Sequence, residues 1–293
     1  MSFTTALFAQ NPPDKQIVKV MPKKKAPKQD GYIFKETTSA DTVVPYAKVN
    51  REDIAYSTRI WREIDLRDRG NAILASPKVN LIGVIYEALN NGELDMYPPD
   101  DEDFQKGETI SQKKINGTGS SAVDTAFLGI NPSTNEINRA DNEFFAVSYP
   151  IIRIKEDWIL DIRRGVFEPR IIGIAPVRID IKTQVDNNGN QLVDPVTNKV
   201  RADTLKSAVG WFYFDDLREI LVKKKVANNG NDNSKINFDD VFVRRLFHSY
   251  ITKRSNAADL RIEDIILNPK ERLLESERIK KALSDFEQSL WDY

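Results

Sequence analysis

Alternation of apolar and polar residues between positions 143 and 185 is the feature that most constrains how this chain can fold. Large apolar residues recur at every second position in two runs, Trp158, Leu160 and Ile162, then Val177, Ile179 and Ile181. Successive side chains of a β-strand point to opposite faces, so this period of two predicts strands with one buried face. Consecutive strands joined by short turns predict an antiparallel sheet.

Helical spacing is predicted in two segments ahead of that stretch. Ile54, Trp61 and Ile64 recur at helical intervals, which predicts a helix over residues 51–69 with Asn50 as its N-cap. A second apolar segment at helical spacing, over residues 79–89, ends at Asn90-Asn91-Gly92.

Three more helical segments are predicted after a strand at residues 211–214. Asp215 is expected to cap the first, and Asn237 with Asp240 opens the second. The second is expected to continue to residue 250 through four residues spaced by four, Phe238, Phe242, Leu246 and Tyr250.

The last helix is predicted from its start signal and its apolar stripe. Asn268 is a typical N-cap, and Pro269 suits the first helical position. The stripe consists of Ile279, Leu283, Phe286 and Leu290.

This order of elements predicts an α+β fold, in which an antiparallel sheet (a meander) packs with helices around a single core. A loop excursion is expected at about residues 98–142. The predicted organisation is a signal-peptide remnant at 1–9, an extended Pro/Lys-rich N-terminal arm at 10–45 and a single α+β domain at 46–293.

The N-terminal segments leave alternatives open. Residues 1–9 are apolar and small, which suits either the end of a secretory signal or an ordinary disordered start. Five prolines within residues 11–45 exclude a continuous helix. The lysines of the arm suit either a solvated linker or a segment that lies along an acidic partner surface; they are Lys19, Lys23, Lys24, Lys25 and Lys28.

Composition excludes several classes of function. The 293 residues include no cysteine and one histidine, His248, which excludes a disulfide scaffold, a thiolate nucleophile and a Cys-ligated or multi-His metal centre. The 43 Lys and Arg residues balance 44 Asp and Glu residues, which argues against a dedicated nucleic-acid binder. No apolar run is long enough to cross a bilayer as a helix.

Motifs for catalysis or cofactor binding are absent from the sequence. Neither a Gly-rich phosphate loop nor a G-x-S-x-G nucleophile elbow occurs. Asp186-Asn-Asn-Gly189 lacks the spacing of a calcium loop and is expected to form a hairpin turn. We therefore predict no catalytic residue, no cofactor and no metal; a hydrolase that uses carboxylates is kept as a third hypothesis.

The segment Trp61-Arg-Glu-Ile-Asp-Leu-Arg67 combines an aromatic residue with dense charge. Trp and Arg are favoured anchors of protein interfaces, whereas a core Trp beside a solvated face is the alternative. Besides the arm lysines, the predicted partner-binding residues are Trp61, Arg62, Glu63, Arg67, Trp211, Arg218 and Trp291.

Several sequence blocks together resemble one family, in whose order they occur, and they cover most of residues 46–293. They are Trp61-Arg-Glu-Ile-Asp-Leu-Arg67, Arg170-Ile-Ile-Gly-Ile-Ala-Pro176, Trp211-Phe-Tyr-Phe-Asp-Asp-Leu-Arg-Glu-Ile-Leu221, Phe242-Val-Arg-Arg-Leu-Phe-His-Ser-Tyr-Ile251, and Leu274-Glu-Ser-Glu-Arg-Ile-Lys280 with Phe286-Glu-Gln-Ser-Leu-Trp291. On these blocks the chain resembles the gliding motility family GldN, also called PorN.

The resemblance implies a non-enzymatic structural subunit of the type IX secretion and gliding machinery, without a cofactor. It implies a periplasmic location at the inner face of the outer membrane. The implied partners are a GldK/PorK-like lipoprotein, with which family members form a ring, a GldM/PorM-like motor protein, and neighbouring copies of the chain itself. The alternative is a monomeric periplasmic adaptor or binding module for an envelope polymer or cargo, which the mass in solution with and without a partner would distinguish.

Overall fold

A computed structural model of the chain describes residues 42–105, 149–183, 202–227 and 236–290. Several predicted features lie outside these residues: the signal remnant, the arm lysines Lys19, Lys23, Lys24, Lys25 and Lys28, the hairpin turn at 186–189, most of the excursion at 98–142, and Trp291.

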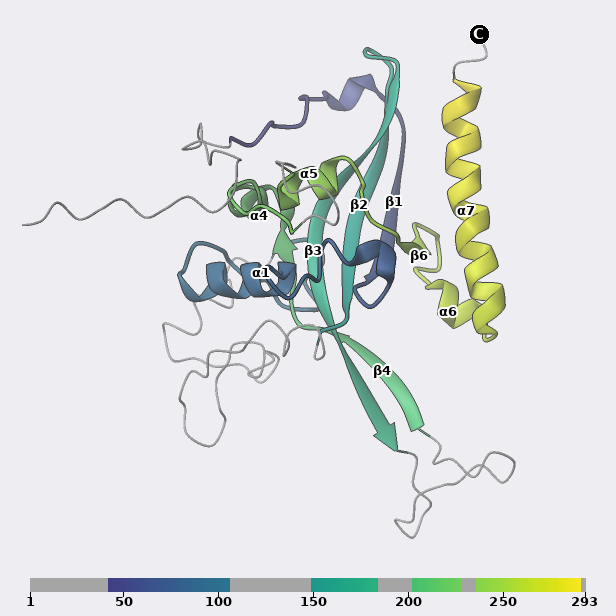
Figure 1. The fold of residues 1–293 in the computed structure, drawn as a ribbon. Helices are drawn as coiled ribbons and strands as arrows, with labels where there is room; N and C mark the ends of the chain where they lie inside the picture. Colours follow the sequence, from purple (N-terminus) through teal and green to yellow (C-terminus); the bar gives the residue numbers. More distant parts are fainter. Residues whose placement is uncertain (1–41, 106–148, 184–201, 228–235, 291–293) are drawn as a thin grey trace, which may run out of the picture. The chain divides into compact units, whose positions relative to one another are not determined.

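The described strands form one antiparallel sheet, as the alternation predicted. The strand order is β4-β3-β2-β1-β6, and β5 pairs with β3 beside this path (Figure 1). The strands are β1 (Ile54–Asp65), β2 (Ile151–Asp161), β3 (Val166–Thr183), β4 (Ala202–Ala208), β5 (Phe212–Tyr213) and β6 (Tyr250–Arg254). Because helices pack against this sheet, the predicted α+β class is confirmed.

The hairpin of β2 and β3 forms the centre of the sheet. Its turn ends at Gly165, whose φ of +65° is a conformation that favours glycine. Further along, β3 places the extra residue Ile172 opposite the step from Lys155 to Glu156, which is a β-bulge. The bulge explains the continuous apolar run at residues 171–175, because it interrupts the strict alternation of the two faces.

The helix predicted over residues 51–69 is wrong, because residues 54–65 form β1 between β2 and β6. Only two short 3-10 turns are helical there, η1 (Arg51–Asp53) and η2 (Arg69–Asn71), and Asn50 precedes η1 without a side-chain cap hydrogen bond. The charged residues that suggested a solvated helix face are buried, Arg62 at 4% and Glu63 at 1% exposure. Both faces of β1 are covered, so the strand shows no apolar–polar alternation.

The predicted extension of the second late helix to residue 250 is also wrong. The helix α5 (Phe238–Val243) begins with the expected capping box at Asn237. Arg245 then has a φ of +56°, which is typical of a residue just beyond a helix end. Tyr250 therefore lies at the start of β6.

Two helices begin at asparagine caps, of which Asn268 was predicted and Asn80 was not. The side chain of Asn80 accepts a hydrogen bond from the backbone of α1 (Leu81–Asn90), and Gly92 follows this helix with a φ of +73°. The side chain of Asn268 caps α7 (Pro269–Ser289) in the same way.

The two other helices are shorter. The helix α4 (Phe214–Leu221) has Tyr213 as its N-cap, so the prediction that Asp215 caps it is wrong. Asp215 lies in the first turn, where its charge suits the helix dipole. The helix α6 (Ile262–Ile265) precedes α7.

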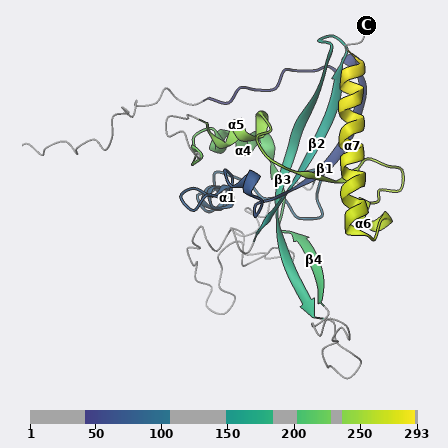
Figure 2. The same ribbon diagram turned by 45° about the vertical axis from the view of Figure 1, so that its right-hand side comes forward.

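Buried apolar side chains form a large cluster and two smaller ones. The large cluster joins α1, α4 and α5 to the sheet. In the second cluster Ile279 and Leu283 of α7 pack with Ile60 and Phe167 of the sheet, which confirms the predicted stripe. Figure 2 shows α7 running alongside β1 and β2.

The helix α7 also occupies the outer edge of β6. The backbone N–H of Ile251 donates to Oγ of Ser276 over 2.7 Å, and both residues are buried. On its other side β6 pairs with β1. A helix side chain therefore satisfies a group that an edge strand normally leaves unpaired.

Candidate functional site

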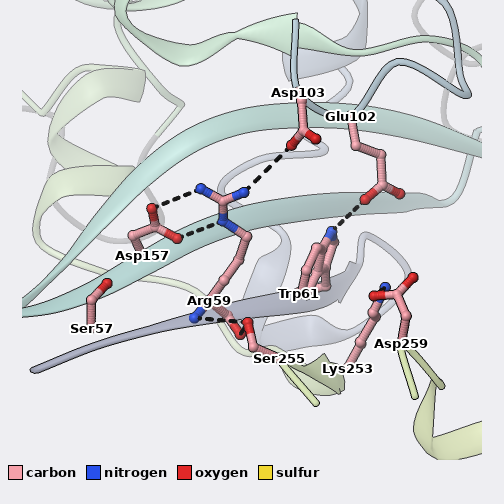
Figure 3. A pocket seen from close by; sticks show the side chains of 9 residues that line it. All are labelled: Ser57, Arg59, Trp61, Glu102, Asp103, Asp157, Lys253, Ser255 and Asp259. Carbon is pink, nitrogen blue, oxygen red and sulfur yellow. Dashed lines mark hydrogen bonds and ion pairs between the residues drawn. The ribbon is translucent and has the colours of Figure 1, made fainter. Parts of the chain in front are cut away.

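A polar groove of about 440 Å³ lies on one face of the sheet (Figure 3). Arg59 and Trp61 of β1 point into it together, because alternate residues of a strand share a face. The polar groove is lined by Ser57, Arg59, Trp61, Glu102, Asp103, Asp157, Lys253, Ser255 and Asp259. Its walls come from the neighbouring strands β2, β1 and β6, the segment at residues 101–105 and the loop that follows β6.

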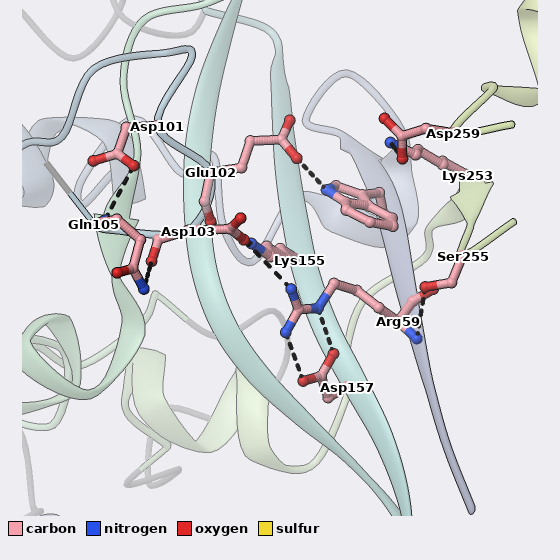
Figure 4. Close-up of polar contacts among 11 residues, drawn as sticks. Arg59, Asp101, Glu102, Asp103, Gln105, Lys155, Asp157, Lys253, Ser255 and Asp259 are labelled. Atoms are coloured by element: carbon pink, nitrogen blue, oxygen red, sulfur yellow. Dashed lines mark hydrogen bonds and ion pairs between the residues drawn. The ribbon is translucent and has the colours of Figure 1, made fainter. Parts of the chain in front are cut away.

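Arg59 is held by a bidentate ion pair across β1 and β2. Its Nε and Nη2 donate to the two carboxylate oxygens of Asp157, over 2.7 and 3.0 Å. Its Nη1 lies 3.4 Å from Oδ1 of Asp103 (Figure 4). The hydrogen bond to Asp157 raises the pKa of Arg59 above its ordinary value, so the guanidinium stays charged.

Lys155 fixes the segment at residues 101–105 over the sheet. Its buried Nζ donates to the backbone oxygen of Glu102 and, over 2.8 Å, to Oδ1 of Asp103. This hydrogen bond and the charge of Lys155 lower the pKa of Asp103. Asp103 is therefore held as a charged carboxylate at the edge of the polar groove.

Trp61 forms the floor of the polar groove and is itself 8% exposed. Its Nε1 donates to Oε2 of Glu102 over 3.0 Å, and Nζ of Lys253 lies 4.4 Å from its ring centre. Trp61 also packs in one small cluster with Trp211 and Ala175. Core burial, the alternative weighed for each Trp, therefore describes Trp61 and Trp211.

Glu63, another predicted partner-binding residue, is at the centre of a buried ionic cluster. It pairs with Arg153 and Lys206, each over 2.7 Å, and accepts a hydrogen bond from the hydroxyl of Tyr250. Burial alone would raise the pKa of Glu63, but the charges of Arg153 and Lys206 lower it below the usual carboxylate value.

Arg218 and Arg67 lie away from the polar groove. Arg218 is buried, pairs with Asp239 over 2.7 Å and donates through Nη2 to the backbone oxygen of Val44. Arg67 is 62% exposed in its side chain and pairs with Asp65. Of the predicted interface residues in the described part of the chain, Arg67 is the one whose side chain is mostly open to solvent.

A second exposed feature, the aliphatic patch, was missed by the sequence analysis. We use this name for five exposed aliphatic side chains that are close in sequence, within residues 260–274, and of which Leu267 reaches 84% exposure: Leu260, Ile265, Leu267, Leu273 and Leu274. A hollow of about 320 Å³ beside it is lined partly by Ile262, Pro269 and Leu273. Leu273 and Leu274 lie outside the predicted apolar stripe of α7. Their position in the sequence could therefore have predicted that they are exposed.

The described residues contain neither a metal-binding cluster nor a helix that could span a membrane. No three or more His, Asp or Glu side chains there are grouped so as to hold a metal ion. None of the described helices combines the length and the apolar character needed to cross a bilayer.

Paired polar side chains together with an exposed aliphatic patch are typical of a protein that binds other proteins. The chain belongs to the GldN family: the model of the gliding motility associated protein GldN matches residues 49–292. This confirms the resemblance seen in the sequence blocks and makes the chain a component of the gliding motility and type IX secretion machinery. A search of curated proteins found no match.

Proposed function

We propose that the chain is a non-enzymatic structural subunit that forms a periplasmic ring, at the inner face of the outer membrane, with a GldK/PorK-like lipoprotein. In this role it contacts neighbouring copies of itself and a GldM/PorM-like motor protein. Membership of the GldN family supports a role in the gliding motility and type IX secretion machinery. The ring, the partners and the periplasmic location go beyond that membership and are what we propose.

The observation that carries this proposal is the aliphatic patch. All five of its large aliphatic side chains are exposed within residues 260–274, and a contiguous apolar surface is typical of sites where proteins associate. A ring subunit needs two different contact surfaces, because head-to-tail contacts close a ring. The aliphatic patch offers one, and the charged polar groove on the sheet offers a surface of different chemistry.

Co-expression with the lipoprotein partner tests the proposal. We expect large annular particles by electron microscopy of the purified complex. Small, discrete complexes at every salt concentration would contradict it.

The polar groove favours one second candidate, a monomeric adaptor that binds an envelope polymer or cargo. Its charged side chains and hydroxyls suit a polar chain. Sedimentation of the protein with and without its lipoprotein partner separates the two functions, because an adaptor stays monomeric while binding its ligand.

A further inference from the structure

A second groove, here called the basic groove, lies between the sheet, the turn after α5 and α7. Its volume is about 600 Å³, and its lining includes Arg62, Trp158, Arg245, Phe247, Glu277 and Lys280. It is thus separate from the polar groove, with which it shares no lining residue.

The floor of the basic groove carries more positive than negative charge. Glu156 is fully buried and pairs with two arginines, Arg62 through Nε and Arg245 through Nη1, the latter over 2.8 Å. Nε1 of Trp158 also donates to Glu156, over 2.8 Å. One carboxylate therefore faces two guanidinium groups, which leaves one positive charge without a direct counterion in this cluster.

Arg62 carries the uncompensated charge. Its side chain is 5% exposed, and Nε is its one hydrogen-bonded nitrogen within the described residues, so Nη1 and Nη2 have no acceptor there. Burial lowers the pKa of Arg62, although the charge of Glu156 opposes this shift. Nη1 and Nη2 still reach the solvent of the basic groove, so both nitrogens can donate to a bound ligand.

The side chain of Arg245 completes this cluster. Its guanidinium lies 5.8 Å from the centre of the Trp158 ring and 5.4 Å from the centre of the Phe247 ring.

Two acidic residues of α7, Glu277 and Glu287, also line the basic groove. The charge of Glu277 favours the charged form of Arg62 and so opposes the lowering of its pKa by burial, but neither acid forms an ion pair with Arg62 in the described structure. Glu277 of α7 is 55% exposed and lies 3.7 Å from Lys280, with which it forms an ion pair.

We propose that the basic groove binds an acidic side chain on an extended segment of a partner protein, with the carboxylate held by Nη1 and Nη2 of Arg62. A guanidinium fork matches a carboxylate in a bidentate pair. A carboxylate alone would leave the rings of Trp158 and Phe247 in contact with solvent. The bound segment therefore has an apolar residue next to its acidic residue, and this residue packs on the two rings. This inference rests on the proposed function, because it names the chemistry of one partner contact.

Two labelled nonapeptides test the proposal by fluorescence polarisation. They share one sequence, in which Leu flanks the central position. The central residue is Glu in the first peptide and Gln in the second. We expect the Glu peptide to bind at least about tenfold more tightly, as a charge-assisted hydrogen bond implies. Equal affinities, or no binding of either peptide, would overturn the proposal.

Arg62→Met separates binding from folding. In this variant Glu156 still pairs with Arg245, so one buried negative charge faces one positive charge. The temperature of thermal unfolding should therefore not fall. The preference for the Glu peptide should disappear. A less stable variant that keeps the preference would make Arg62 a structural residue. The matched control Arg67→Met removes an exposed arginine of the same strand region and should change neither property.

Glu277→Gln offers an independent test at an exposed position. Removing this acid from the wall of the basic groove should tighten binding of the Glu peptide and leave the Gln peptide unchanged. Weaker binding of the Glu peptide would contradict the proposal. If rings form with the lipoprotein but the peptides are not distinguished, the inference fails while the proposed function stands.

Discussion

Nζ of Lys206 on β4 lies 2.7 Å from Oε2 of Glu63 on β1, although β3 and β2 separate these strands in the sheet. The hydroxyl of Tyr250 on β6 donates to the same oxygen over 2.5 Å. The sheet is therefore curled enough for side chains from both of its ends to meet on Glu63. Because Arg153 of β2 pairs with Glu63 as well, this one buried carboxylate links side chains of four strands.

Glu63 should make stability depend on pH. Its folded pKa lies below the usual value, so its contribution is complete above the usual carboxylate range and is lost as pH falls through the folded pKa. At neutral pH, Glu63→Gln should lower the free energy of unfolding by about 3–5 kcal/mol, since it leaves buried cations unpaired. Urea unfolding at a series of pH values should show this deficit shrinking in acid.

The control for that experiment is Glu52→Gln, which changes an exposed carboxylate next to β1. It should leave stability unchanged at every pH. A deficit for Glu63→Gln that stays constant down to strongly acidic pH would contradict the role given to its ionisation.

Trp211→Ala should show that this residue belongs to the core. Trp211 is fully buried, and its Nε1 lies 3.3 Å from the backbone oxygen of Pro99. Truncation should cost about 3–5 kcal/mol in denaturant unfolding. Arg67→Ala, at an exposed position, should stay within about 0.5 kcal/mol. Similar values for both variants would argue against the packing described for Trp211.

The N-terminal arm should separate into a dispensable part and an anchored part. Arg218 donates to the backbone oxygen of Val44 over 2.7 Å, and its guanidinium lies 5.0 Å from the ring centre of Tyr46. Removing residues 1–41 should leave thermal unfolding unchanged and weaken partner binding. Removing residues 1–46 should in addition cost about 1–3 kcal/mol, because a buried charged donor loses its acceptor. Equal stability of the two truncations would refute the anchor.

Polar substitution in the aliphatic patch should affect assembly without affecting folding. Leu267→Gln and Leu273→Gln change exposed side chains, so their unfolding midpoints should match that of the wild type. The yield of complex with the lipoprotein should fall severalfold. Ile162→Gln, an equally exposed aliphatic position at the β2–β3 turn, is the matched control and should assemble normally. Normal assembly of all three variants would remove the patch from the interface.

Local chemistry made much of the fold predictable. The predicted capping residues Asn237 and Asn268 act on backbone groups two or three positions away, so their effect can be read directly from the sequence. The alternation over residues 143–185 predicted β2 and β3 because one strand follows the other directly.

Long-range pairing accounts for what the sequence did not reveal. Arg62 and Glu63 looked like a solvated helix face, but their counterions Glu156 and Arg153 lie about ninety residues away in the chain. Arg59 was missed as a groove residue for the same reason, since its partner Asp157 comes from another strand. Trp61 and Trp211 were both selected, and only the folded sheet brings them into one cluster.

The hydroxyl of Ser276 that occupies the N–H of Ile251 has a consequence for how copies of this protein associate. A second chain that approached β6 at Ile251 would meet an occupied donor, so this point of the strand is protected against the addition of a further strand.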